Sequence, residues 1–585
     1  ASRSTASLGG GIRAITGGTR RAPKLCHSAR SALAPMQSTP FRPEFLRKSS
    51  AERNADSWRQ SLRSLDVGFR ASTDTGLALP TDIRRGATLA AVLLRFGSAF
   101  RHHPERLDAA DKAALYARSR PVERLDAFVS HSWSSPGYQK YLSLLFAEVS
   151  RISLAAAAAG GFAVYLLQHR RQELLPGNFV VEAAFSPLFL LPQVTSPYEF
   201  LAANLLALLS FAAAPALLTR RCYFVDCLCI HQTDHDLKLR GIRHLGGFLS
   251  RSSKLVVLWD ESYFRRLWCI YEIAVFKAVH PEAPVQLHPL RLSVATALLA
   301  SFFVLGAGLY VGIYPYVAPF GIGTFYAASF SCSAVVFGGS AVAGHDFARQ
   351  RSALVEHLSA FDARSARCYC EADRAEIVVA IERMYGGIDS FNRMVRGKIM
   401  REVLSSLSRQ RGLVPYRVMA TGVVLPGIGF FFFAVSWFRH ASLATQLAFG
   451  MYMVTFVACA MPLLAGWSLE QGSRLPPCDG PAGLRRFWRS HLSIGLQSAS
   501  LFIFGHASAA FILPLAVANT AAVERVGLPA SVGGAVSLLL AAATNAPLVH
   551  ACVEMYRSRP APPPERTSAP DERDSVGEAS VWKCD

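Results

Sequence analysis

One carboxylate stands out on an apolar stretch in the middle of the chain. Glu272 follows Trp268 by four residues in the segment 263–278, whose pattern predicts a helix, and residues at that spacing lie one turn apart on one face. An indole beside a carboxylate forms an apolar wall that strengthens the local effect of its charge. Such a pair suits the stabilisation of positive charge on a ligand. The alternative is an ordinary helix glutamate that faces solvent or pairs with Arg265 or Arg266.

A second polar group follows a predicted strand that begins at about Leu125. Ser130, His131, Ser132 and Trp133 come at the carboxyl end of this strand. Ligands bind outside the carboxyl ends of strands in open α/β sheets, so these four residues form a candidate ligand surface. An ordinary turn between a strand and a helix explains them equally well.

The strand that precedes the Glu272 helix is the clearest element of the sequence. Residues 255–259 form an unbroken apolar run, which suits a parallel strand covered on both faces. The polar residues 260–262 then break the run and can cap the start of a helix. We expect this strand to pair with the earlier one, so that Phe128 and Val257 lie in neighbouring strands of one sheet.

These two segments resemble the two signatures of the Toll/interleukin-1 receptor (TIR) domain family. Residues 126–130 read Asp-Ala-Phe-Val-Ser, and residues 266–273 read Arg-Leu-Trp-Cys-Ile-Tyr-Glu-Ile. The chain also resembles multi-span TIR-like proteins of protist and algal lineages. The resemblance implies a flavodoxin-like α/β domain with a parallel sheet.

Several TIR families cleave NAD at the nicotinamide–ribose bond, and the resemblance places Glu272 at the position of their catalytic glutamate. Departure of nicotinamide leaves an oxocarbenium-like ribose, which a carboxylate stabilises or traps, as in glycosidases. NAD would then be a substrate, and no cofactor is implied. Other TIR domains only act as scaffolds. On this resemblance the ligand-binding candidates are Ser130, His131, Ser132, Trp133 and Trp268, and the structural candidates are Asp126, Asp226 and Cys269.

The composition indicates an integral membrane protein with soluble parts. Of 585 residues, 51% are hydrophobic and only 17% are charged, which is apolar for a soluble protein of this size. The net charge of +20 is explained by Lys and Arg that flank membrane spans. No basic stripe is interleaved with aromatic residues, which argues against nucleic-acid binding. The 12 scattered cysteines fit a reducing compartment for the soluble part.

Long uncharged segments predict an α-helical transmembrane bundle of about eight spans in four hairpins. Every hairpin returns the chain to the same, basic side, which the positive-inside rule makes cytoplasmic. The first hairpin, 152–218, interrupts the TIR-like unit, and a buried helical hairpin is its alternative. The apolar segments are 152–168, 200–218, two within 292–344, 418–438, 442–468, 492–518 and 532–552.

The sequence divides into six regions by composition. We expect a basic, largely disordered region over 1–119, whose acid-free start also suits an organelle transit peptide. The TIR-like domain covers 120–290, with Asp226 ending a strand over 220–230. A cytosolic helical segment, 346–415, could complete this domain through residues 384–396. The other regions are a transmembrane hairpin at 291–345, four transmembrane helices over 416–556 and a disordered tail at 557–585.

Three functions remain open on this sequence. The first is a membrane-anchored TIR-like signalling or assembly protein that self-associates through its cytosolic domain. The second is an NAD-cleaving hydrolase that uses Glu272. The third is a transporter or channel, which the scarcity of ionisable residues in the later spans disfavours. A metal site is not expected, because Cys227 and Cys229 are spaced C-x-C rather than as in common zinc sites.

Overall fold

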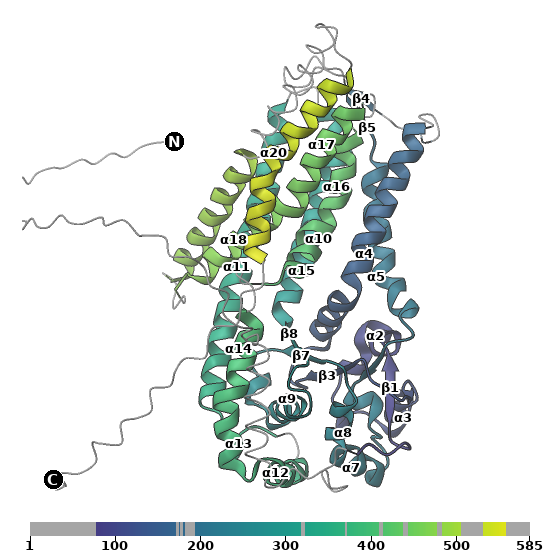
Figure 1. The fold of residues 1–585 in the computed structure, drawn as a ribbon, viewed down its shortest axis with the longest axis vertical. Coiled ribbons are helices and arrows are strands. Elements are labelled where there is room, and N and C mark those ends of the chain that lie inside the picture. Colours follow the sequence, from purple (N-terminus) through teal and green to yellow (C-terminus); the bar gives the residue numbers. More distant parts are fainter. Residues whose placement is uncertain are drawn as a thin grey trace, which may run out of the picture. The chain divides into compact units, whose positions relative to one another are not determined.

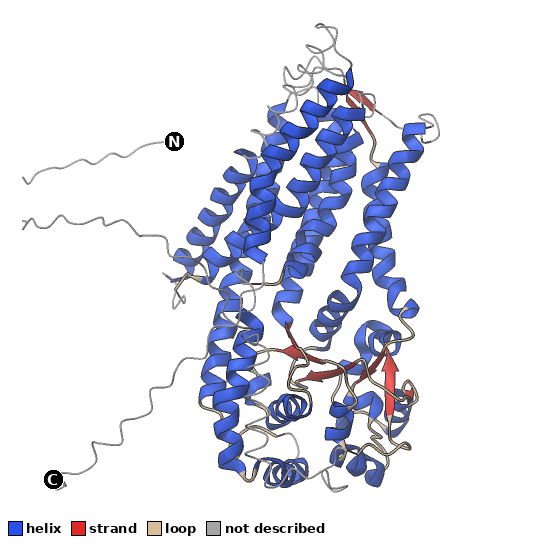
Figure 2. Cartoon of the chain, viewed as in Figure 1, coloured by secondary structure: helices blue, strands red, loops and turns tan. Residues whose placement is uncertain are grey.

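The computed structural model describes residues 78–170, 175, 179–181, 193–317, 322–368, 371–408, 414–436, 443–476, 483–504 and 530–556. All of them belong to one compact unit. Helices make up most of the described chain, and its strands form one six-stranded and one two-stranded sheet (Figure 1, Figure 2). The predictions for residues 1–77, for the end of the seventh span and for the tail at 557–585 lie outside the described residues.

The larger sheet joins two parts of the chain that are separated by the first helical hairpin. Its order is β2-β1-β6-β3-β7-β8, and the last four strands of this order are parallel. Phe128 pairs with Leu255 and Ser130 with Val257, which confirms that Phe128 and Val257 lie in neighbouring strands. The strands are β1 (Arg85–Thr88), β2 (Arg120–Pro121), β3 (Ala127–His131), β6 (Cys222–Phe224), β7 (Leu255–Trp259) and β8 (Val285–Pro289).

The central strands are covered on both faces. Every residue of β3 and β7 is buried, as expected for apolar parallel strands between layers of helices. On one face the rings of Phe128 and Phe224 stack with centroids 4.5 Å apart. Helix α9 (Leu267–Val279) follows β7 and carries Glu272. This core fixes the ends of β3 and β7, from which the candidate site is built.

The predicted start of the folded domain at residue 120 is wrong. Residues before it form β1, helix α2 (Leu89–Gly97) and helix α3 (Ala109–Tyr116). Strand β1 runs antiparallel to β6 and extends the sheet at that edge. Its sequence, Arg-Gly-Ala-Thr, lacks the alternating apolar pattern that predicts a strand. Pairing with β6, rather than its own side chains, makes this segment a strand.

The predicted strand over 220–230 is also too long. Strand β6 ends at Phe224, and Asp226 begins a helical turn, α6 (Asp226–Cys229). The amide of Ile230 donates to the carbonyl of Asp226 at 2.9 Å and closes this turn. Cys227 and Cys229 therefore do not alternate along a strand, and both are buried in the core.

Six helices are long and apolar enough to cross a membrane among the residues that the structure describes. This agrees with a multi-pass protein and with six of the eight predicted spans. The helix over 483–504 and helix α20 (Ala530–Tyr556) lie where the seventh and eighth were predicted. The six are α4 (Gly137–Arg170), α5 (Tyr198–Leu217), α10 (Leu290–Val317), α11 (Ile322–Ser359), the helix Tyr416–Ser436 and the helix Gln446–Ser473.

Helix α4 connects the sheet directly to the membrane helices. It begins six residues after β3 ends at His131 and continues for 34 residues, about 50 Å at the rise of an α-helix. In the first half of α4, Glu148 forms ion pairs of 2.7 Å with both Lys254 and Arg221, which precede β7 and β6. One carboxylate on α4 thus holds two strands of the sheet.

The segment after α11 covers the other side of the sheet. Helix α12 (Glu371–Tyr385) packs against α9, and helix α14 (Met400–Ser408) packs against β8. Helix α13 (Ile388–Met394) and the π-helical turn Val395–Ile399 join them. The prediction of a helical segment over 346–415 is confirmed for its described residues, and this segment supplies helices that residues 120–290 lack.

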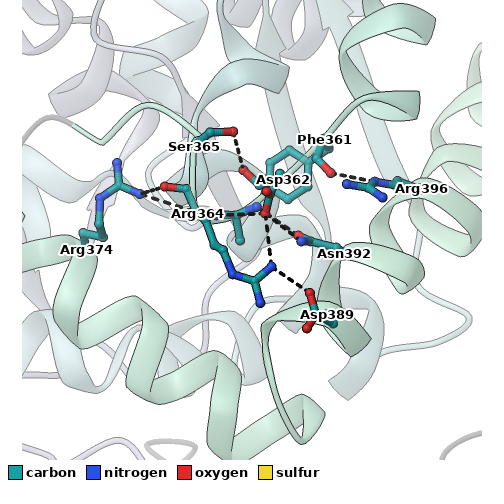
Figure 3. A network of polar contacts seen from close by, with 9 residues as sticks. Phe361, Asp362, Arg364, Ser365, Arg374, Asp389, Asn392 and Arg396 are labelled. Atoms are coloured by element: carbon teal, nitrogen blue, oxygen red, sulfur yellow. Dashed lines mark hydrogen bonds and ion pairs between the residues drawn. The ribbon is translucent and has the colours of Figure 1, made fainter. Parts of the chain in front are cut away.

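A polar network holds the loop between α11 and α12 (Figure 3). Asn392 accepts a hydrogen bond from the amide of Ala363 at 2.9 Å and donates to Asp362 at 2.7 Å. Arg396 donates to the carbonyl of Phe361 at 2.7 Å. Helix α13 and the turn after it therefore bind two backbone groups of this loop, the amide of Ala363 and the carbonyl of Phe361.

Candidate functional site

Glu272 contacts the end of strand β3. The hydroxyl of Ser130 donates a hydrogen bond to Oε2 of Glu272. The hydroxyl of Tyr263 lies 2.5 Å from Ser130 Oγ and 3.4 Å from the carbonyl of Cys269. A strand end, the turn after β7 and the first turns of α9 are thereby joined around one carboxyl group.

This carboxyl group is poorly solvated. Burial raises the pKa of Glu272 from 4.5 to about 8; the hydrogen bond from Ser130 opposes the rise, and the negative charge of Asp226 adds to it. Glu272 is therefore largely protonated at neutral pH in the unliganded protein. A carboxyl with a perturbed pKa at the carboxyl end of a sheet is a candidate for function.

The ordinary pairing that the sequence left open for Glu272 is not formed. Within the described residues, neither Arg265 nor Arg266 makes an ion pair with it. Arg265 instead donates to the ring of His357 at 2.6 Å. The backbone directly after Arg266 is also bonded elsewhere, because the amide of Leu267 donates to the carbonyl of Arg367. Glu272 is half-buried and is held by the sheet rather than by surface cations.

The indole of Trp268 forms a hydrogen bond with Asp373 of helix α12. Burial raises the pKa of Asp373, and a hydrogen bond from Trp268 opposes part of that rise. Trp268 is half-buried against the main core. The sequence-based prediction of an apolar wall beside Glu272 stays a prediction, since the polar edge of this indole is directed to α12.

A second cluster surrounds Trp133, just beyond the end of β3. Its indole donates to Asp226 at 2.9 Å. The rings of His131 and His103 lie edge-on to it, with centroid distances of 4.7 and 5.2 Å. The ammonium of Lys140 lies 5.2 Å from the centroid of the Trp133 ring. The turn after β3 is thus a compact group of aromatic and ionisable side chains.

The ionisable members of this cluster are strongly affected by their surroundings. Burial and then the positive charge of Lys140 hold the pKa of His131 well below its usual range. Burial raises the pKa of Asp226, while hydrogen bonds from the amide of Cys227 and from Trp133 oppose that rise. Asp226 therefore ties the turn after β3 to helix α6.

Serine hydroxyls connect the turns that follow β3 and β7. Ser132 lies 2.9 Å from the hydroxyl of Ser262. Ser135 and Ser262 each donate to a different oxygen of Asp260, both at 2.7 Å. The predicted ligand residue Ser132 is therefore buried in a network that fixes the two turns relative to each other.

The remaining predicted residues anchor the elements around the site. Asp126 accepts from the amide of Cys222 at 2.7 Å, so it joins the starts of β3 and β6. The thiol of Cys269 lies 3.7 Å from the carbonyl of His131. That contact places the first turn of α9 beside the Trp133 cluster and links it to Glu272, one turn further along.

Sequence reasoning missed six members of the site: His103, Ser135, Lys140, Asp260, Ser262 and Tyr263. Asp260 and Ser262 were interpreted only as helix-start residues, although their place after a buried strand is also a place for ligands. Lys140 lies three residues after Gly137, in the first turn of α4, and its burial could not be predicted from its polarity. In the described ranges, no group of three His, Cys, Asp or Glu residues is arranged to hold a metal ion.

Comparison with known proteins identified no relative of this chain. No family model, no curated protein and no solved structure matches the chain. The function must therefore be argued from the geometry of the two clusters.

Proposed function

We propose that this chain is a multi-pass membrane protein with a cytosolic, flavodoxin-like TIR domain. The order of its four parallel strands, β6-β3-β7-β8, supports this proposal. Of these four, β3 comes first in the sequence and lies between β6 and β7, the second and the third, as in flavodoxin-like sheets. The six apolar helices support anchoring in a bilayer, with two further spans after residue 483. The basic residues of the connecting segments favour a cytoplasmic position for the domain.

The activity that the geometry supports best is cleavage of NAD at the nicotinamide–ribose bond. The observation that carries it is the hydrogen bond from Ser130 to Glu272, which places the carboxyl group where ligands of parallel sheets bind. The bond from C1′ of ribose to the ring nitrogen breaks, and its electron pair leaves with neutral nicotinamide. Water adds to the resulting cation and loses a proton, which gives ADP-ribose.

The high pKa of Glu272 is compatible with this chemistry. A cationic nicotinamide ring beside the carboxyl group favours its ionised form, so substrate binding would release a proton. The carboxylate formed in this way lies in a poorly solvated place, where its attraction for the developing ribosyl cation is stronger than in water. Ser130 would hold its orientation through the shared hydrogen bond.

The test is NAD cleavage by the purified full chain. We expect Glu272→Ala to lose cleavage and Glu382→Ala, on an exposed position of α12, to retain it. General acid–base or electrostatic groups of this kind contribute on the order of 10²–10⁴ in rate. Equal cleavage by the wild-type chain and Glu272→Ala would contradict the enzymatic proposal.

Signalling by self-association is the second candidate, and one surface feature favours it. Phe96 is 75% exposed and Leu94 is 50% exposed. Arg95 and Phe96 both have positive φ, 51° and 55°, a backbone conformation that residues other than glycine rarely adopt. Such a fixed apolar projection suits contact with a second copy of the chain. Phe96→Ser should then lower the mass measured by light scattering in detergent, and an unchanged mass would exclude this surface.

A further inference from the structure

Lys140 carries a buried charge with no hydrogen-bond partner in the described chain. Its side chain is completely buried, and its Nζ contacts no acceptor. An ammonium has three donors, and burying it without acceptors destabilises a fold. Lys277 shows the usual arrangement, because its Nζ is bonded to the carbonyls of Pro281 and Ala283 at 2.6 and 3.2 Å and lies 3.1 Å from Glu402.

The position of Lys140 is one that favours anions. It lies in the first turn of α4, and its ammonium folds back over the rings of Trp133, 5.2 Å away, and Phe100, 6.0 Å away. Trp133 follows β3, so the charge lies where a strand ends and a helix begins. The amides of a helix N-terminus and the carboxyl ends of parallel strands both receive phosphate groups.

Two carboxylates also act on this charge. The negative charges of Asp226 and Asp260 act on Lys140, and neither carboxylate forms an ion pair with it in the described chain. The contact between Cys269 and His131 puts Glu272 beside the same cluster. A ligand that carries a negative diphosphate and a positive ring offers one group to Lys140 and one to Glu272.

We propose that Lys140 and the N-terminus of α4 bind the diphosphate of a dinucleotide, and that the ribosyl end of the ligand reaches Glu272. This subsite rests on the proposed function for the identity of the ligand, but binding of a diphosphate is separate from cleavage. Phosphate oxygens accept hydrogen bonds from the ammonium when the ligand binds. Without ligand the ammonium lowers the stability of the protein.

The experiment uses the full chain in detergent with inorganic pyrophosphate as the probe. Pyrophosphate should raise the Tm of the wild-type chain and change its tryptophan fluorescence, because Trp133 lies against the site. Lys140→Met should bind at least about tenfold more weakly, as expected for loss of a charged hydrogen bond. The matched control is Lys277→Met, which removes a buried lysine that has its partners and should leave pyrophosphate affinity unchanged.

Stability without ligand gives a second readout. Lys140→Met should have a higher Tm than the wild-type chain, because it removes a charge without acceptors, whereas Lys277→Met should have a lower one. If Lys140 only packs on Trp133 as a cation–π contact, Lys140→Met lowers the Tm and pyrophosphate binds neither chain. That result, or equal pyrophosphate affinity of Lys140→Met and wild type, overturns the proposal.

Two further comparisons separate related explanations. A phospholipid headgroup offers the same phosphate chemistry, so pyrophosphate binding is repeated in nanodiscs of neutral and of acidic lipid. Loss of binding in acidic lipid alone would assign the subsite to the bilayer and overturn the dinucleotide proposal. Pyrophosphate binding without NAD cleavage would support the subsite and contradict the enzymatic function. NAD cleavage without pyrophosphate binding would support the enzymatic function and overturn the subsite.

Discussion

Ser130 donates a hydrogen bond to Glu272 across 142 residues of sequence. The intervening chain includes helices α4 and α5, both long and apolar enough to cross a membrane. The candidate site is therefore complete only when the strand before this hairpin and the helix after it pack together. Any movement of α4 relative to the sheet would act directly on the residues that hold Glu272.

The first prediction concerns the pH dependence of stability. The pKa of Glu272 is about 8 in the fold and close to 4.5 when the chain unfolds, so between these values the folded state binds the additional proton. The free energy of unfolding should then fall as pH rises through this window. Glu272→Gln cannot ionise, so its Tm should exceed that of the wild-type chain at about pH 9 but not at about pH 5. A constant Tm difference across this range would contradict the assignment.

The second prediction concerns Ser130. Ser130→Ala removes the hydrogen bond that favours the ionised carboxyl, so the pKa of Glu272 should rise further and the unfolding free energy should fall by about 1–3 kcal/mol. In a cleavage assay, the acid limb of the pH–rate profile should move to higher pH. Tyr263→Phe is the matched control, since it leaves Ser130 and Glu272 bonded. An acid limb at the same pH in Ser130→Ala and wild type would show that Ser130 does not act on this carboxyl.

The sequence was sufficient for the central part of this arrangement. Two apolar runs followed by polar residues predicted two neighbouring parallel strands, with Ser130 at the carboxyl end of the first and Glu272 on the helix that follows the second. Pairing of Phe128 and Ser130 with residues of β7 follows from the same pattern. Periodicity and burial are local properties, so they can be recognised from a short stretch of residues.

The residues that were missed depend on contacts between distant segments. Lys140 looks like a surface residue of a helix start, and only the packing of Phe100 and Trp133 over it makes it buried. Strand β1 has a weak pattern of its own and is formed by pairing with β6. The helical turn at Asp226 replaced an expected strand because its backbone closes locally after three residues of sheet. Such outcomes are set by tertiary structure rather than by propensity.

The third prediction tests the connection between α4 and the sheet. The side chain of Glu148 is only 3% exposed and is paired with Lys254 and Arg221. Glu148→Gln leaves two cations without their partner, and since both are partly exposed the expected loss of stability is about 1–3 kcal/mol. Arg474→Ala breaks an exposed ion pair with Glu470 and should change the unfolding free energy by less than about 0.5 kcal/mol. Similar losses in the two variants would argue against a buried connection.

The fourth prediction concerns the loop network in Figure 3. Asn392→Ala removes the acceptor of the buried Ala363 amide and the donor to Asp362, which should lower stability by about 1–3 kcal/mol. Hydrogen exchange at Ala363 should become faster in this variant. Arg364→Ala removes the ion pairs of Arg364 with Asp389 at 2.7 Å and with Asp362 at 3.9 Å, but it leaves the Ala363 amide bonded to Asn392, so that exchange should stay unchanged. Unchanged protection in Asn392→Ala would show that the loop does not depend on α13.

The fifth prediction tests the packing of two predicted spans, α11 and the helix α18 (Met461–Ser473). A Cβ at Gly344 would overlap the carbonyl of Leu469, and a Cβ at Gly472 would overlap the carbonyl of Ala341. These reciprocal contacts describe an antiparallel crossing in which backbones touch, an arrangement that small residues permit in membranes. Gly344→Ala must push the helices apart and should lower the unfolding free energy by about 1–3 kcal/mol.

Gly450 provides the control for this crossing. It lies in helix α17 (Leu443–Thr455), and a Cβ there would meet nothing within 4 Å. Gly450→Ala should therefore keep or raise the Tm, because alanine favours the helix by about 1 kcal/mol over glycine. If Gly344→Ala also keeps its Tm in detergent and in lipid, α11 and α18 do not approach at their backbones. Helix α11, which leads from the apolar helices to helices α12 to α14, would then lack this backbone contact with α18.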